Sequence, residues 1–125
     1  MTTLAQRRPL STDEQAVLEL LVNLDFAGAS ELRAQVPHAW VVGTCDCGCA
    51  TVDLEVDQDE ALPARNVTSP IPGEATVLDE RREPAGGVIV FLRDGYLSML
   101  EIYSADEPIT VWPSMDRLSA YVSSR

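Results

Sequence analysis

Lysine is absent from this 125-residue chain, and all nine basic residues are arginines. Together with 20 acidic residues they give a formal net charge of −11. The arginines are not clustered, and binding to phosphate groups needs clustered basic residues, so the sequence argues against a nucleic-acid partner. The acidity has three interpretations: it repels other acids, it attracts a basic protein partner, or it only keeps the protein soluble.

Long apolar runs are absent as well. No run approaches the roughly 18 residues that a membrane span needs. The N-terminal stretch MTTLAQRRPL contains two arginines, but the apolar segment of a secretory signal does not follow them. We therefore expect a cytoplasmic protein with no membrane partner. The three cysteines, an odd number, fit this interpretation because a reducing compartment keeps thiols free.

Complete catalytic motifs are also missing. The chain contains neither a G-x-S-x-G motif nor a glycine-rich phosphate loop, and His38 is its only imidazole. A cysteine nucleophile would need such a base and usually a lowered pKa. An enzyme therefore has little support in the sequence, and we assign no catalytic residue.

The N-terminal part of the chain predicts two helices. After a loose tail at residues 1–10, Ser11 precedes Glu14 by three positions, which is the spacing of a capping box. Apolar residues at helical spacing follow for several turns. A second, shorter helix is expected at about residues 30–35, and Pro37 stops it from continuing beyond Val36. Two helices joined by a few residues usually pack as a hairpin.

The rest of the chain predicts strands and turns. Apolar and polar residues alternate over residues 51–57, which indicates an antiparallel sheet with one face toward solvent. The dipeptide Asp94-Gly95 is typical of a tight hairpin turn. The run VIVFLR before it lacks alternation, which predicts a central strand with both faces covered.

These signals place strands near residues 39–42, 51–57, 74–79, 88–93 and 96–103, a long surface loop at 58–73 and a helical turn within 114–121. The expected fold is one α+β domain over residues 1–125. In it an N-terminal helical hairpin packs on an antiparallel sheet of about five strands, because helices and strands occur in separate runs of the sequence.

The main candidate site is the stretch TCDCGC, in which Cys45, Cys47 and Cys49 could bind zinc or Cu(I), with His38 completing a zinc set of four ligands. An extended strand would repeat alternate cysteines at about 6.6 Å, whereas thiolates on one zinc ion lie within about 4 Å of each other. The segment must therefore curl, which Gly48 permits. The alternatives are cysteines that behave as small hydrophobic residues, and redox sensing or a Cys45–Cys49 disulfide.

A row of carboxylates is the second candidate. Asp53, Glu55 and Asp57 fall on one face of the expected strand at residues 51–57. Like charges this close repel, so an arginine on the next strand or a basic partner would balance them, unless the face is simply solvated. Calcium is disfavoured because the EF-hand spacing is missing.

Two stretches, LRAQVPHAWVVGTCDCGCATVDLEV and DGYLSMLEIYSADE, are similar to those of a family of short, acidic, uncharacterised bacterial proteins with a CxCGC stretch. The resemblance extends from about Val17 to Leu118. It implies no activity, ligand or catalytic residue, and implies only that the cysteine loop belongs to the fold. The use of arginine alone is typical of a GC-rich bacterial genome.

The sequence favours a small, non-catalytic protein-interaction or accessory module, because the charge is high and no catalytic set is complete. The alternative is a metal-binding protein of the zinc type, or a thiol-redox protein. Either would use Cys45, Cys47 and Cys49, with His38 as the fourth metal ligand.

Overall fold

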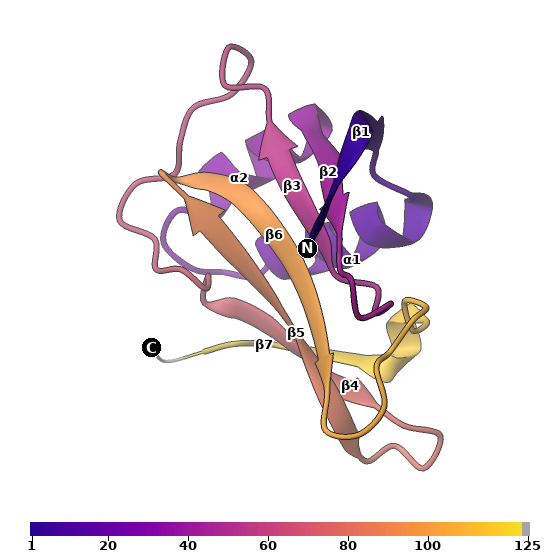
Figure 1. Cartoon of the computed structure of the whole chain (residues 1–125). Helices are drawn as coiled ribbons and strands as arrows, with labels where there is room; N and C mark the ends of the chain where they lie inside the picture. The colour runs from indigo at the N-terminus through magenta and orange to yellow at the C-terminus, as the bar shows by residue number, and fades with distance from the viewer. Residues whose placement is uncertain (124–125) are drawn as a thin grey trace.

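The computed structural model describes residues 1–123 and has the expected α+β class (Figure 1). Seven antiparallel strands form one sheet in the order β1-β2-β3-β6-β5-β4-β7, and the two helices lie on one of its faces. The elements, in chain order, are β1 (Thr2–Pro9), α1 (Thr12–Val22), α2 (Ala29–Gln35), a 3-10 turn (Val36–His38), β2 (Ala39–Thr44), β3 (Val52–Val56), β4 (Gly73–Leu78), β5 (Pro84–Arg93), β6 (Tyr96–Ser104), a 3-10 turn (Met115–Arg117) and β7 (Leu118–Val122). Within residues 1–123, neither helix is long and apolar enough to cross a bilayer.

The five expected strands are present as β2 to β6, but an edge strand at each end of the chain raises the number to seven. Residues 1–10, expected as a loose tail, contain β1, which pairs with β2 near both of its ends and bulges between Thr3 and Arg8. Residues 118–122, expected within a helical turn, form β7 beside β4. Edge strands are held mainly by backbone hydrogen bonds on one side, so their sequences need little apolar alternation and give little signal.

Helix α1 begins at the predicted capping box. The backbone N–H of Glu14 donates to Ser11 Oγ at 3.1 Å, and the backbone N–H of Ser11 donates to Glu14 Oε1 at 2.8 Å. This reciprocal pair satisfies two backbone donors that a helix start would otherwise leave free. The acidic residues Asp13 and Glu14 in the first turn also favour the positive end of the helix dipole.

The two helices contact each other, but they differ from the expected hairpin in two respects. They follow β1, so they are not the N-terminal element. In addition, the chain does not stop turning at Val36 but continues through Pro37 in a 3-10 turn. Proline is tolerated there because the first N–H groups of a helical turn have no partner within the turn.

The core lies between the helices and the sheet, and its fully buried side chains include Leu18, Leu21, Leu32, Val41, Val88, Val90 and Leu100. Within the described chain, neither helix lies over the opposite face of the sheet (Figure 1). β5 lies between β6 and β4, so its predicted central position is confirmed. Ile89 and Phe91, on the face opposite the helices, are only partly buried, so that face of β5 is covered less completely than predicted. The apolar residues Ile109 and Trp112, which follow β6, pack against the core.

Candidate metal and thiol centre

The three cysteines lie in the loop that joins β2 to β3, at residues 45–51. The loop is closed by the backbone N–H of Cys45, which donates to Thr51 O at 3.3 Å. Inside it, the N–H of Gly48 donates to Cys45 O at 3.3 Å, and Gly48 has a φ of +88°. Only glycine adopts such a φ without strain, so this residue lets the segment curl.

The curl brings the three sulfur atoms together. The Sγ atoms of Cys45, Cys47 and Cys49 all lie within 4.8 Å of one another. Cys45 Sγ and Cys47 Sγ are 3.0 Å apart, and the backbone N–H of Cys49 donates to Cys47 Sγ at 3.3 Å. The 6.6 Å repeat of an extended strand therefore does not apply, and the separations suit three ligands of one metal ion.

The pKa values of Cys47 and Cys49 are shifted in opposite directions. Hydrogen bonds to Cys45 and Cys49 raise the pKa of Cys47 to about 11. Burial tends to raise the pKa of Cys49, but hydrogen bonds from Thr51 and Cys47 outweigh it and lower that pKa to about 7. At pH 7 Cys49 is therefore partly ionised, whereas Cys47 keeps its proton. A metal ion that takes all three sulfurs must displace the remaining protons.

Thr51 anchors the loop to the centre of the sheet. Its hydroxyl donates to Ile102 O at 3.2 Å and accepts from Ile102 N at 3.0 Å, and its side chain is buried. Interactions with Thr51 also lower the pKa of the nearby Cys49 thiol. The alternation of residues 51–57 predicts Thr51 on the same solvent-facing side as Asp53 and Glu55, so the pattern in the sequence does not reveal this buried anchor.

The start of β1 holds the other side of the loop. The amino group of Met1 lies 2.8 Å from Asp46 Oδ2, and the hydroxyl of Thr2 donates to Asp46 Oδ1. The amino group and Thr2 together hold the pKa of Asp46 below its usual value. The carboxylate between the first two cysteines is therefore already engaged in contacts with β1.

His38 is not near the cysteines. It follows Pro37 at one end of β2, while Cys45 follows the other end, and its carbonyl accepts a hydrogen bond from Asp57 N at 3.0 Å. The six residues of β2 span about 20 Å at the rise of an extended strand. Among residues 1–123, the group of ligating side chains close enough to share one metal ion consists of Cys45, Cys47 and Cys49, without His38.

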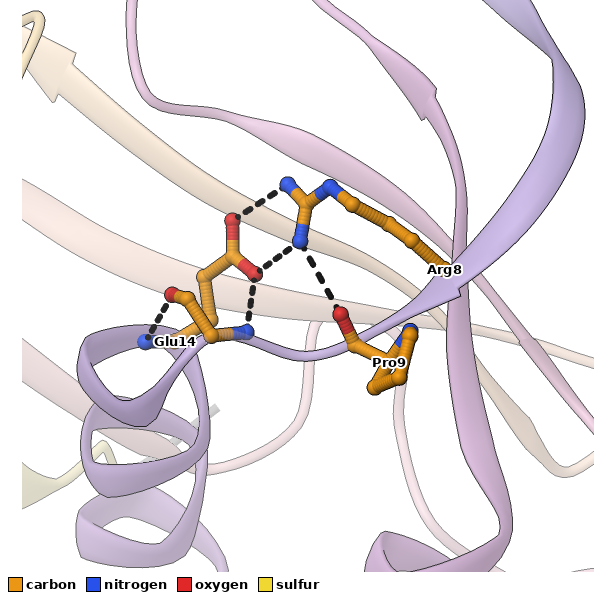
Figure 2. Close-up of polar contacts among 4 residues, drawn as sticks. Arg8, Pro9 and Glu14 are labelled. Atoms are coloured by element: carbon orange, nitrogen blue, oxygen red, sulfur yellow. Dashed lines mark hydrogen bonds and ion pairs between the residues drawn. The ribbon is translucent and has the colours of Figure 1, made fainter.

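A hollow of about 300 Å³ adjoins the cluster and is lined in part by Cys49, Thr51, Arg8, Glu14 and Trp112. Figure 2 shows the ion pair beside it, in which Arg8 Nη1 and Nη2 lie 2.8 and 3.0 Å from Glu14 Oε1 and Oε2. Burial tends to raise the pKa of Glu14, but Arg8 and Ser11 bind its charged form and hold the pKa below its usual value. The capping box identified Glu14 in the sequence, whereas nothing local indicated Arg8.

The similarity to a family of acidic bacterial proteins stays a prediction, because comparison of the chain with protein-family models, with curated proteins and with solved structures found no match.

Proposed function

We propose that the cysteine loop binds one thiophilic metal ion, Zn²⁺ or Cu⁺, through Cys45, Cys47 and Cys49. The observation that supports this most is the convergence of the three sulfurs within 4.8 Å. Thiolates are the preferred protein ligands for both ions. On Zn²⁺, three protein ligands leave the fourth coordination position open. Because Cys47 is exposed, a bound ion would be accessible from solvent.

Metal titration of the reduced protein against a chromophoric chelator tests this proposal. We expect one ion per chain, and each of Cys45→Ser, Cys47→Ser and Cys49→Ser should weaken binding by more than the roughly 10–100-fold that loss of an outer-shell contact costs. The matched control is His38→Ala, which should bind as wild type because His38 lies at the far end of β2. Unchanged binding by all three serine variants would contradict the proposal.

The same loop supports a second candidate, thiol oxidation, because the pKa of Cys49 is lowered to about 7 and two thiols lie beside it. The Cys49 thiolate would attack a peroxide, giving a sulfenic acid and releasing hydroxide or alkoxide. A neighbouring thiol would then condense with it, forming a disulfide and water. Titration of free thiols after peroxide treatment should show a fall from three to one, restored by a reductant; three remaining thiols would exclude this candidate.

We also propose that the protein acts as an accessory module for a basic protein partner. Its support is the open face of the sheet, where Asp53, Glu55 and Glu101 accompany half-buried Phe91 and Met99. A salt-sensitive partner is expected on such an acidic face, because screening weakens attraction between exposed charges. A pull-down from the native host at low and high salt tests this, and the absence of any protein at either salt would count against it.

A further inference from the structure

Strands β3 and β6 separate partway along their length (Figure 1). Their ladder consists of two registered pairs, Val52 with Leu100 and Asp53 with Met99. The same register would pair Leu54 with Ser98, but within residues 1–123 the pairing does not continue although β3 runs on to Val56. The sheet is therefore split at this end, and the edge of β3 facing β6 is not used by its neighbour.

The split is held open by Gln35, which comes from the end of α2 and is fully buried. Its amide nitrogen donates to Gly95 O at 2.9 Å and to Leu62 O at 3.0 Å, and its Oε1 accepts from Leu97 N at 3.0 Å. The backbone N–H of Ala64 also donates to Gly95 O at 2.8 Å. The tip of the β5–β6 hairpin is thus bound to α2 and the long loop, which keeps it away from β3.

A hollow of about 480 Å³ lies in this split, within the usual range for ligand pockets. One side carries Asp53 and Glu55 from β3, and the other carries Arg93 and Asp94. Asp57 also lines it but is already paired with Arg7, at 2.8 Å. The charge left in the hollow is therefore negative, with three carboxylates against one guanidinium.

We propose that this hollow binds an extended peptide of alternating basic and apolar residues, which adds as a strand along the free edge of β3. This inference rests on the proposed interaction function and gives it a site, and it is independent of the cysteine cluster. Addition of a strand to an exposed sheet edge is an established mode of peptide recognition, in which the backbone gives affinity and alternate side chains give specificity.

The alternation of β3 selects this peptide chemistry. Asp53 and Glu55 point to the open face, while Leu54 and Val56 point to the core side. A strand paired with residues 54–56 of β3 would place one side chain opposite Glu55 and another diagonal to Asp53, whose own partner is Met99. Basic residues at these two positions form favourable cross-strand pairs. The alternate residues of the peptide would point to the other side, toward Leu54 and Leu97 of the hollow, which favours apolar side chains there.

The test uses ¹⁵N-labelled full-length protein and the peptide acetyl-Arg-Val-Arg-Val-Arg-Val-Arg-amide. We expect saturable shifts of the amide resonances of residues 54–56 and 97–98 at about 50 mM salt, reduced at about 500 mM. The comparison peptide replaces each valine by proline, which keeps the charge but removes backbone donors. It should bind at least about tenfold more weakly if the backbone pairs with β3.

Two double variants that lose the same charge distinguish binding in the hollow from nonspecific attraction to the acidic protein. Asp53→Asn with Glu55→Gln should weaken the valine peptide about tenfold. Asp106→Asn with Glu107→Gln, on the exposed segment after β6, should leave its affinity within about twofold. Equal losses in both variants, equal binding of the proline peptide, or no shift at residues 54–56 would each overturn the proposal. If a salt-sensitive host partner is still captured by the Asp53/Glu55 variant, the interaction function stands and only this site is wrong.

Discussion

The two ends of the β2–β3 hairpin are built in opposite ways. At the cysteine end, residues 44–52, the chain is tied to its neighbours: Thr51 bridges to β6, and Ala50 N donates to Ile109 O at 2.8 Å. At the split end, residues 54–57, β3 does not pair with β6, and the Gln35 side chain from α2 bonds to the backbone of β6 instead. The tied end can hold three thiols in a fixed arrangement, whereas the split end offers a free strand edge.

Each end depends on one buried polar side chain that bonds to the backbone of β6. Gln35 and Thr51 are both at most 4% exposed, and each satisfies backbone groups that would otherwise be buried without partners. A buried polar group without a hydrogen bond is costly, so these two side chains set the stability of their respective ends. Substitutions at Gln35 and Thr51, and at residues near them, test whether each side chain stabilises its own end of the hairpin.

The largest effect is expected from Gln35→Ala at the split end. The change leaves Leu62 O, Gly95 O and Leu97 N without this partner and also opens a cavity. We expect a loss of about 3 kcal/mol or more in the free energy of unfolding, measured by urea denaturation. A loss below about 1 kcal/mol would show that water replaces the amide, and that Gln35 does not hold the split end.

Glu14→Gln tests the ion pair next to the cysteine end and should cost about 1–3 kcal/mol at neutral pH. The folded-state pKa of Glu14 lies below its ordinary value of 4.5. Its charged form therefore stabilises the fold above pH 4.5, and this contribution disappears as the pH falls through the lower folded-state pKa. The difference in urea midpoint between wild type and variant should thus shrink in acid. A difference that is constant with pH would contradict this role of the charge.

Thr51→Val at the cysteine end should have a smaller effect than Gln35→Ala, because the shape is nearly preserved and the hydroxyl bonds to the backbone of one residue, Ile102. We expect a loss of about 1–2 kcal/mol by urea denaturation. Thr51→Ser is the matched control, because it keeps the hydroxyl. If the valine and serine variants lose the same stability, the hydrogen bonds to Ile102 are not what holds this end.

The smallest energetic effect concerns the protonation of the thiols. Peptide mass spectrometry can follow the rate of iodoacetamide modification at each cysteine. The rate should rise with pH with an apparent pKa of about 7 at Cys49 and of about 11 at Cys47. Because the folded-state pKa of Cys49 is lowered, its thiolate stabilises the fold at high pH, and this is lost as the pH falls through 7. Thr51→Val should move the Cys49 profile upward. Identical profiles at the two cysteines would contradict the arrangement.

The candidate site was predictable in part. The sequence identified the three cysteines and the need for a turn at Gly48, which the structure contains. It also suggested His38 as a ligand, and the structure places that residue at the other end of β2. A spacing of seven residues in the chain is short, but an extended strand turns it into a long distance in space. Spacing alone therefore could not show which residues meet.

The sequence by itself determined the local features of this protein. The capping box at Ser11 and Glu14, the alternation of β3 and the turn at Asp94-Gly95 all depend on residues a few positions apart, so their patterns are visible in the chain. The tertiary structure alone decided the edge strands, the split and the anchoring of the cysteine loop. Gln35 meets Leu97 over a separation of 62 residues, and Thr51 meets Ile102 over 51. Such contacts form only when the sheet has assembled and brings distant segments together. No pattern within one segment of the sequence specifies its distant partner.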